Sequence, residues 1–365
     1  MLLQSVETRA FRNLRDQRVR LSPQATVLFG PNGQGKTNFL EACYLVSTLR
    51  PLRAQKLHEL VRLGTEGPAQ VRAQFATAGG AREIAVEVGR EGRTARVDGK
   101  ALTDPDELFG GLATVAFTPD DLAVIKGGPD GRRRLLDRAV QNRHPSHLPD
   151  SRDYLRALHS RNLLLKQQAP DALLDSFEEP LARLGAKIRA RRDEVLAELR
   201  PHATRAFAEV ARGEAPLELK PPAPDTSEQA LREQLRDRLP RDRDRGYTSV
   251  GPHADDLGIL LGGRPARLYA SQGQSRAAVL AFKIGEIENL REKQGRAPLL
   301  LLDDVSSELD PERNAFLMAY LAALNGQVVL TTTDVQLVAK SAAKDALFQR
   351  VTQGAIGPEN AVFST

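Results

Sequence analysis

The chain has 365 residues, of which 41% are hydrophobic and 27% are charged, values typical of a folded protein of two or three domains and not of a disordered chain. Its 52 Lys and Arg residues, 41 of them Arg, exceed its 47 Asp and Glu residues, which is compatible with a nucleic-acid partner without requiring one. The single cysteine, Cys43, excludes an internal disulfide framework and favours the reducing cytoplasm. The sequence shows no signal peptide and no apolar run of about 18 residues, so secreted and membrane proteins are not expected.

Short strands are predicted for most of the first 120 residues. Apolar stretches or strict alternation of apolar and polar residues mark residues 2–11, 24–30, 71–76, 82–88 and 93–97. The pairs Gly79–Gly80 and Asp98–Gly99 are typical of turns between such strands. This part of the chain is therefore expected to form a sheet.

Long helices are predicted from about Asp121 to Tyr247, because apolar residues recur at helical spacing over residues 151–168 and 171–212. The proline-rich residues 213–229 favour an extended linker. After about Ser249, short strands return and then alternate with helices, which is typical of a parallel α/β sheet.

The domain organisation follows from this order. We expect an α/β domain with a mixed β and parallel α/β sheet, formed by residues 1–120 and 250–365. A helical arm domain, residues 121–249, is inserted into it.

A complete phosphate-binding loop follows the first apolar strand. Gly30-Pro31-Asn32-Gly33-Gln34-Gly35-Lys36-Thr37 matches G-x-x-x-x-G-K-[ST] in full and lies between an apolar strand and a helix. Its glycines let backbone N–H groups surround an anion at the start of the helix. Lys36 is expected to reach the β and γ phosphates of ATP, and the Thr37 hydroxyl to ligate Mg²⁺. A chance glycine turn before a helix is the alternative, and both flanking elements argue against it.

An acidic strand end is the second candidate element of the site. Residues 297–302 form a continuously apolar run, as in a strand buried on both faces of a parallel sheet, and Asp303 and Asp304 follow it. Ligands bind at the carboxyl ends of such strands. We therefore expect Asp303 to hold Mg²⁺ and Asp304 to act as a general base that orients water. The alternative is a strand that ends in a solvated turn.

A third motif narrows the class, because a phosphate-binding loop alone is shared by many functions. Ser271-Gln272-Gly273-Gln274 opens a helix and ends 29 residues before Asp303, and Ser307-Glu308-Leu309-Asp310 follows that acid. This order resembles the signature motif and D-loop of the ABC-type ATPase heads of SMC-type chromosome and repair proteins. Taken alone, the first motif is also compatible with a plain helix cap at Ser271.

The chain as a whole resembles the RecF family of bacterial recombination mediators. The segments that carry the resemblance are 11–14, 30–37, 117–121, 126–129 with 132–134, 249–256, 271–274 and 299–310. They cover essentially the whole length. The resemblance implies an ABC/SMC-type ATPase head with a short helical arm, in agreement with the inserted helical segment.

The resemblance also implies a function. It implies a protein of DNA repair, DNA replication and the SOS response that binds ATP with Mg²⁺ and forms an ATP-dependent homodimer. In that dimer Lys36, Asp303 and Asp304 would be catalytic, and Ser271, Gly273 and Gln274 would contact the nucleotide of the other subunit. Such a protein binds double-stranded DNA and single-strand/double-strand junctions and works with RecR and RecO to load the RecA recombinase at gaps.

Two departures from ABC heads predict a weak ATPase. The strand around residues 328–332 ends without the usual His, so Thr333 and Asp334 stand at the γ-phosphate sensor position. Asp304 stands where SMC heads usually carry Glu. A nucleotide-gated scaffold or clamp in which hydrolysis is incidental remains open. A small-molecule phosphotransferase would leave the motifs after residue 270 unexplained.

The DNA-contacting residues are not specified by the sequence. Residues 121–250 contain 25 basic and 21 acidic residues, with local arginine clusters at 132–134, at 189, 191 and 192, and at 241, 243 and 245. These clusters fit either phosphate contacts or solvated helix faces. Aromatic residues are scarce, at 5%, which favours contact with a duplex backbone over base stacking. The six histidines show no metal-binding spacing, and the role of His253 stays open.

Overall fold

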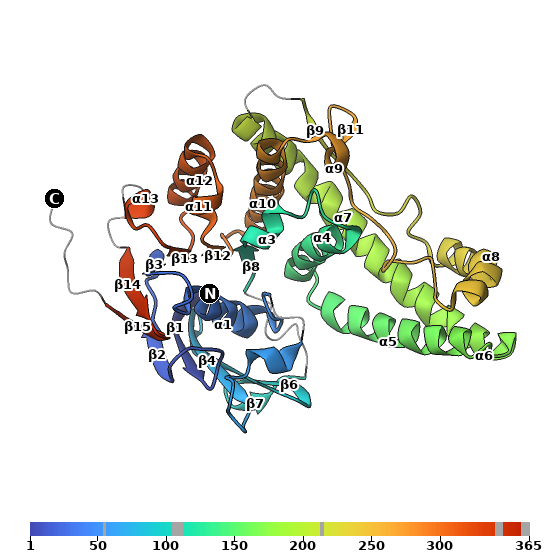
Figure 1. The fold of residues 1–365 in the computed structure, drawn as a ribbon, viewed down its shortest axis with the longest axis horizontal. Coiled ribbons are helices and arrows are strands. Elements are labelled where there is room, and N and C mark those ends of the chain that lie inside the picture. The colour runs from blue at the N-terminus through green and yellow to red at the C-terminus, as the bar shows by residue number, and fades with distance from the viewer. Residues whose placement is uncertain (54–55, 104–111, 212–214, 340–345, 359–365) are drawn as a thin grey trace. The chain divides into compact units, whose positions relative to one another are not determined.

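A computed structural model describes residues 1–53, 56–103, 112–211, 215–339 and 346–358 (Figure 1). These residues form two compact units, Met1–Asp120 with Leu290–Thr365, and Asp121–Asn289. The second unit includes residues 250–289, which the sequence assigned to the ATPase head. Their functional assignment to the head stays a prediction. No helix in the described part of the chain is long and apolar enough to cross a membrane.

The first unit contains a six-stranded antiparallel sheet. Its strand order is β2 (Gln17–Arg20), β1 (Leu2–Arg9), β4 (Ala69–Thr77), β5 (Gly80–Gly89), β6 (Gly92–Val97) and β7 (Lys100–Ala101). Val71, Ala73 and Phe75 of β4 are buried, whereas Arg72 between them is exposed. The alternation read from the sequence thus produces a sheet with one buried and one solvated face.

The second sheet of this unit is mainly parallel. Its order is β15 (Ala355–Pro358), β14 (Leu347–Thr352), β3 (Ala25–Phe29), β13 (Val328–Thr332), β12 (Leu299–Asp303) and β8 (Thr114–Phe117), and only β15 runs antiparallel to its neighbour. Every residue of β12 and β13 is buried, as expected of central parallel strands. Asp303 pairs in register with Thr331, so the carboxyl ends of these strands meet at one edge.

Helix α1 (Lys36–Thr48) lies between the two sheets of the unit (Figure 1). It contacts β8, β12 and β13 of one sheet and β1, β4 and β5 of the other. Phe39, Leu40 and Leu45 are fully buried, and burial raises the pKa of the Cys43 thiol. A helix packed on both sides holds the loop at its N-terminus in a fixed place. The unit also contains η1 (Leu57–Leu60), α11 (Val305–Glu308), α12 (Pro311–Ala323) and α13 (Gln336–Ala339), and α3 (Pro119–Leu122) crosses its boundary.

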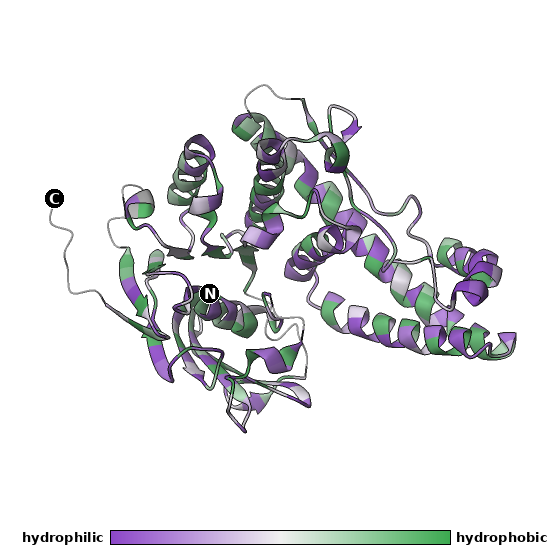
Figure 2. Ribbon diagram, in the orientation of Figure 1, coloured by the Kyte–Doolittle hydropathy of each residue, from purple (hydrophilic) through white to green (hydrophobic). Residues whose placement is uncertain are grey.

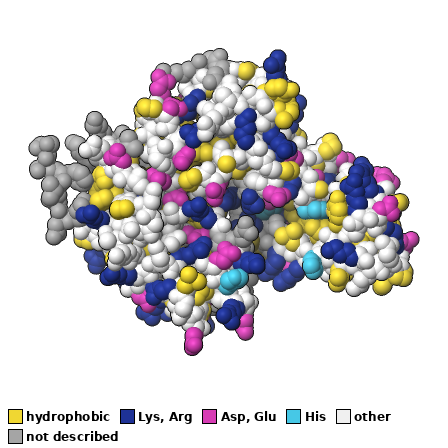
Figure 3. Space-filling model, in the orientation of Figure 1, with side chains coloured by type: hydrophobic (Ala, Val, Ile, Leu, Met, Phe, Trp, Pro, Cys, Tyr) yellow, Lys and Arg dark blue, Asp and Glu magenta, His cyan; other side chains and the backbone are white. Residues whose placement is uncertain are grey.

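The second unit is mainly helical. It contains α4 (Pro129–Arg143), α5 (His147–Lys166), α6 (Asp171–Asp175), α7 (Glu178–Ala211) and α8 (Glu228–Arg245). Helix α7 packs against α4, α5 and α8, and its Leu181, Leu184 and Ile188 form a core with Tyr154 and Leu231. Hydrophobic and hydrophilic residues alternate along α5 and α7 in Figure 2, as in amphipathic helices. Side chains of both charge signs are interleaved on the surface of this unit in Figure 3.

A small sheet corrects one expectation from the sequence. The predicted linker 213–229 contains β9 (Leu217–Lys220), although residues 213 and 214 lie outside the described part. Strand β9 pairs with β10 (Gly258–Leu261), which also pairs with β11 (Arg264–Pro265). The pairing partner lies far along the chain and cannot be read from the local proline content. Helices α9 (Ala266–Tyr269) and α10 (Gln272–Gln294) follow.

Candidate nucleotide-binding site

The phosphate-binding loop, residues 30–37, connects β3 to α1 and depends on glycine geometry. Gly30 has φ 148° and Gly35 has φ 111°, values that favour residues without a Cβ atom. A Cβ atom on Gly30 would lie 2.5 Å from the Val351 carbonyl oxygen, and one on Gly35 would lie 2.9 Å from Asn13 Oδ1. The backbone of this loop therefore requires glycine at both positions.

A cavity of about 250 Å³ opens in front of this loop. It is lined by Asn32, Gly33, Gly35, Lys36, Thr37, Asn38, Arg53, Asp303 and Asp304. Lys36 Nζ donates hydrogen bonds to the carbonyl oxygens of Gly30 at 2.6 Å and Pro31 at 2.9 Å. Burial lowers the pKa of Lys36, while the nearby Asp304 and Asp303 carboxylates act in the opposite direction. The structure therefore brings the predicted Lys36, Thr37, Asp303 and Asp304 around one cavity.

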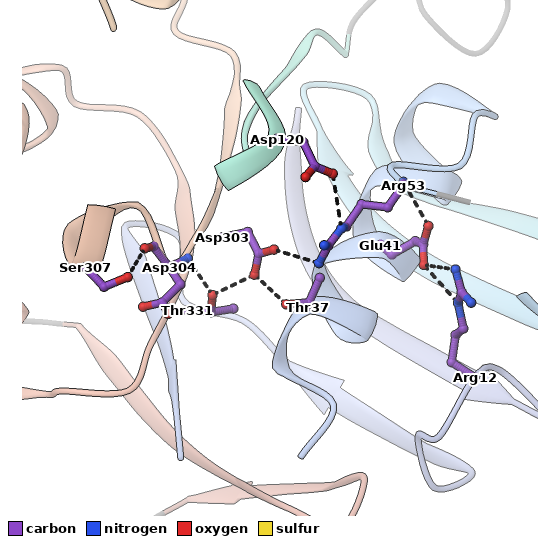
Figure 4. A network of polar contacts seen from close by, with 9 residues as sticks. All are labelled: Arg12, Thr37, Glu41, Arg53, Asp120, Asp303, Asp304, Ser307 and Thr331. Atoms are coloured by element: carbon purple, nitrogen blue, oxygen red, sulfur yellow. Dashed lines mark hydrogen bonds and ion pairs between the residues drawn. The ribbon is translucent and has the colours of Figure 1, made fainter. Parts of the chain in front are cut away.

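Thr37 and Asp303 form the centre of the polar network in Figure 4. Thr37 Oγ1 donates to Asp303 Oδ1 at 2.6 Å, and Thr331 Oγ1 donates to the same oxygen at 3.0 Å. Asp303 is only 2% exposed. A hydroxyl and a carboxylate at this distance are the hard oxygen ligands that Mg²⁺ prefers, so the residues fit the predicted ion. No group of three or more His, Cys, Asp or Glu residues suited to a metal occurs in the described ranges, so phosphate and water would complete the coordination.

Asp304 occupies a separate position beside this pair. Its backbone is left-handed, with φ 49°, and its N–H donates to Thr331 Oγ1 at 2.9 Å. Its Oδ1 is buried and has no hydrogen-bond donor among the residues described. Burial raises the pKa of the Asp304 carboxyl, and the Lys36 charge partly offsets this effect. A carboxylate with increased proton affinity, facing a phosphate cavity, has the properties of a general base.

Arg53 is a cavity residue that the sequence did not reveal (Figure 4). Its Nη1 lies 3.7 Å from Asp303 Oδ2, and its Nε lies 3.6 Å from Asp120 Oδ2. Its backbone N–H donates to Glu41 Oε1 at 3.1 Å, and Glu41 Oε2 accepts from Arg12 Nε at 3.0 Å. Glu41 is 1% exposed, and this acidic residue among the apolar neighbours Phe39, Leu40, Ala42 and Cys43 was the one available signal in the sequence.

Segments distant in sequence support the back of the loop. The Gly354 N–H donates to the Gln34 carbonyl oxygen at 2.9 Å, and Asn13 Nδ2 donates to the Gly33 carbonyl oxygen at 3.1 Å. Asn38 Nδ2 in turn donates to Asn13 Oδ1 at 2.7 Å. The 11–14 segment, which carried part of the resemblance, therefore positions the loop.

The predicted signature residues lie in the second unit, at the start of α10. Gln274 N–H donates to Ser271 Oγ at 3.1 Å, and the Ser271 N–H donates to Gln274 Oε1 at 2.8 Å. This reciprocal pair is a capping box, so the helix-cap alternative is confirmed as a structural role. Ser271 is exposed and Gly273 is half-buried. A contact of Ser271, Gly273 and Gln274 with nucleotide on a second subunit stays a prediction.

The predicted sensor position lies at the end of β13. Thr333 and Asp334 are both exposed. Asp334 Oδ1 accepts a hydrogen bond from the Gln336 N–H at 2.9 Å, which caps the start of α13. A contact of Thr333 or Asp334 with the γ phosphate stays a prediction.

The arginine clusters of the second unit are mostly engaged within the protein. Arg132 pairs with Asp256 at 2.7 Å, Arg189 with Asp255 at 2.8 Å and Arg192 with Asp137 at 2.8 Å. All three arginines are at most 5% exposed. Arg191 pairs with Asp150, Arg133 with Asp130, and Arg243 with Asp171. These side chains hold helices and loops together, so neither phosphate contact nor a simple solvated face describes them.

His253 lies in the same buried region. The His253 Nε2–H donates a hydrogen bond to the Thr248 carbonyl oxygen at 2.9 Å. The Tyr154 hydroxyl donates a hydrogen bond to His253 Nδ1 at 2.7 Å. Its role in this structure is therefore to link the 248–256 segment to α5.

Known proteins are similar to this chain over nearly its whole length. The profile of the RecF/RecN/SMC N-terminal domain family matches residues 2–355. The DNA replication and repair protein RecF of Myxococcus xanthus is 53% identical over 369 residues, which cover 98% of this chain and 97% of that protein. The RecF of Geobacter sulfurreducens is 38% identical over 366 residues, which cover 98% of this chain and 100% of that protein.

Solved structures agree with the sequence comparison. The recombination mediator protein RecF-ATP in the RecFOR pathway has a TM-score of 0.84 at 31% identity and covers 98% of this chain and 97% of that chain. An SMC head domain with an extended coiled coil from Pyrococcus furiosus has a TM-score of 0.57 at 16% identity and covers 97% and 95% of the two chains, which shows a shared fold. The fold is therefore that of an SMC-like ATPase head, and the chain belongs to the RecF family.

Proposed function

We propose that the chain is an ATP-dependent DNA-binding protein of DNA replication and repair. The observation that carries this proposal is the Thr37–Asp303 hydrogen bond of 2.6 Å at the mouth of a complete phosphate-binding loop. Support comes from relatives named DNA replication and repair protein RecF and from a similar structure named for RecF with ATP.

Each site residue has a role in this proposal. Lys36 exchanges its two carbonyl partners for the β and γ phosphates of ATP, and the loop N–H groups hold the phosphate chain. Thr37 and Asp303 would hold Mg²⁺, which would neutralise charge on the phosphates. Asp304 orients the attacking water and accepts its proton. Arg53 adds a permanent positive charge to the same cavity.

Nucleotide binding acts as a switch for dimerisation in this proposal. Ser271, Gly273 and Gln274 of a second subunit present the N-terminus of α10 to the γ phosphate, where an anion is favourable. The ATP dimer then binds double-stranded DNA at junctions with single strands and works in the cytoplasm with RecR and RecO to load RecA at gaps. We expect hydrolysis to be slow and stimulated by DNA, because Asp304 is shorter than Glu and because Thr333 and Asp334 stand where ABC heads usually carry His.

Light scattering with ATP, with ADP and without nucleotide, each repeated with gapped DNA, tests this proposal. A dimer is expected with ATP only, and a monomer that ignores ATP would contradict it. ATPase assays with and without duplex DNA distinguish this proposal from a clamp in which hydrolysis is incidental. Duplex DNA should raise turnover in the first case and leave it unchanged in the second. A turnover well above about 10 per second, the typical enzyme median, would contradict slow hydrolysis.

A further inference from the structure

The solvated face of the antiparallel sheet carries a row of exposed arginines. Arg18 of β2 lies opposite Glu7 of β1, which lies opposite Arg72 of β4. The row continues through Ala85 of β5 to Arg96 of β6. The three arginines are therefore on alternate strands, about 10 Å apart from one to the next.

These arginines differ from those of the second unit in having no carboxylate partner among the described residues. Arg72 and Arg96 make no side-chain hydrogen bond or ion pair there, and Arg18 Nε donates only to Ser5 Oγ at 3.0 Å. Glu7, which separates Arg18 from Arg72 in the row, pairs with Arg9 at 2.8 Å.

The remaining acidic residues of this face are also occupied. Glu83 accepts a hydrogen bond from Gln74 Nε2 at 2.8 Å, and Glu87 accepts one from Gln70 Nε2 at 3.0 Å. Both glutamates are half-buried, whereas Arg18, Arg72 and Arg96 are exposed. The outermost groups of the face are thus positive charges without partners. Lys and Arg side chains are visible at the lower left of Figure 3, where Figure 1 places β2, β1 and β4.

We propose that this face binds the phosphate backbone of duplex DNA through Arg18, Arg72 and Arg96. The proposal rests on the proposed DNA-binding function and assigns it a surface. The outward residues of β1, β2, β4, β5 and β6 include no aromatic side chain on which bases could stack, so a single strand is not favoured. The row spans about 20 Å, the length of roughly six base pairs, over which a duplex presents phosphates of both strands.

The test compares two triple variants with equal changes in charge. In the first, Arg18, Arg72 and Arg96 are changed to Gln. In the control, Arg183, Arg205 and Arg238 of the second unit, which are exposed and lie outside the three arginine clusters, are changed to Gln. Anisotropy of a labelled 30-base-pair duplex is measured with ATP over a range of NaCl concentrations. We expect the first variant to bind at least about tenfold more weakly, and the slope of log K against log salt to fall by about 0.9 for each phosphate that is no longer neutralised, with the control close to wild type.

Several outcomes separate this surface from the proposed function. Wild-type affinity and slope in the first variant, or an equal loss of affinity in the control, would overturn the surface alone. Competition by poly-glutamate as strong as competition by duplex would overturn the assignment to DNA. A wild-type protein that dimerises with ATP yet binds no duplex overturns the surface and the DNA-binding function together. Thermal unfolding and ATP-dependent light scattering of each variant confirm the fold, and single Arg72→Gln replaces the triple variant if the latter unfolds.

Discussion

At the scale of single residues, the site depends most on Asp303. Its Oδ1 accepts hydrogen bonds from Thr37 and Thr331, and its other oxygen faces Arg53. Asp303→Asn removes the charge that is proposed to hold Mg²⁺ while keeping the shape of the side chain. We expect hydrolysis to fall by about 100-fold or more, with ATP binding retained in part. Single-turnover hydrolysis and equilibrium binding of a fluorescent ATP analogue measure the two effects.

Asp304 provides the matched comparison for Asp303. Asp304→Asn should also lower hydrolysis, because it removes the proposed base, but it should leave the Mg²⁺ dependence of nucleotide binding near wild type. The same loss of Mg²⁺ dependence in both variants would contradict the division of roles between the two carboxylates.

His253 predicts a pH dependence of stability. Burial lowers the pKa of His253. The Thr248 carbonyl and the Asp255 and Asp242 carboxylates oppose this shift, whereas the Arg133 charge adds to it. In the unfolded chain His253 has its ordinary pKa of about 6.5, which is higher than its pKa in the folded protein. Below about pH 6.5 the unfolded chain therefore binds more protons than the folded protein, and the free energy of unfolding should fall as the pH drops. Urea unfolding of wild type and His253→Gln from pH 8 to pH 5 measures this effect. Identical pH profiles for the two proteins would contradict it.

At the scale of secondary structure elements, close packing of α10 against α7 gives a further prediction. A Cβ atom on Gly285 would lie 2.9 Å from the backbone nitrogen of Ala203 and 3.0 Å from the Leu199 carbonyl oxygen. Backbone atoms cannot rotate away, so Gly285→Ala should lower the free energy of unfolding by about 1–3 kcal/mol despite the better helix propensity of Ala.

Gly131→Ala in α4 is the control for this packing. A Cβ atom there meets Val124 at 3.4 Å, an ordinary contact distance. The control should therefore be neutral or more stable by up to about 1 kcal/mol. Urea unfolding measures both variants, and equal stability of Gly285→Ala and wild type would show that the two helices can separate without a cost in stability.

The same scale shows which elements the sequence could predict. Strand β3, the loop and α1 are encoded by adjacent residues, and β12 by an uninterrupted apolar run, so these parts of the site were predictable. Strand β9 was not, because its pairing with β10 joins segments about 40 residues apart. Arg53 was not predicted either, since its place in the cavity depends on Glu41 and on the sheet order.

At the scale of the whole molecule, the net charge of the chain indicates little about DNA binding until the ion-pair partner of each arginine is known. The sequence places most of the net charge of +5 between residues 121 and 250, where it fits either phosphate contacts or solvated helix faces. The structure pairs Arg132, Arg189 and Arg192, each at most 5% exposed, with carboxylates of the same unit. Arginines that look alike in sequence thus differ in whether an internal carboxylate already pairs with them, and an unpaired arginine is the better candidate to bind an external phosphate.

The proposed dimer gives the prediction for the molecule as a whole. Ser271 is exposed at the start of α10, and its Oγ already accepts a hydrogen bond from Gln274 N–H. Ser271→Arg places a long side chain where the second subunit's nucleotide is expected and should abolish ATP-dependent dimerisation. It should leave ATP binding to the monomer within about twofold, because Lys36, Thr37 and Asp303 lie in the other unit.

Ala208→Arg, at an exposed position of α7 in the same unit as Ser271, is the control. It adds the same side chain and the same charge at a position outside the signature motif. Light scattering with ATP should detect a dimer for wild type and Ala208→Arg and a monomer for Ser271→Arg. If Ser271→Arg dimerises with ATP as wild type does, the start of α10 lies outside the interface. Its capping box is then a purely structural feature, and a different surface must couple nucleotide binding to assembly.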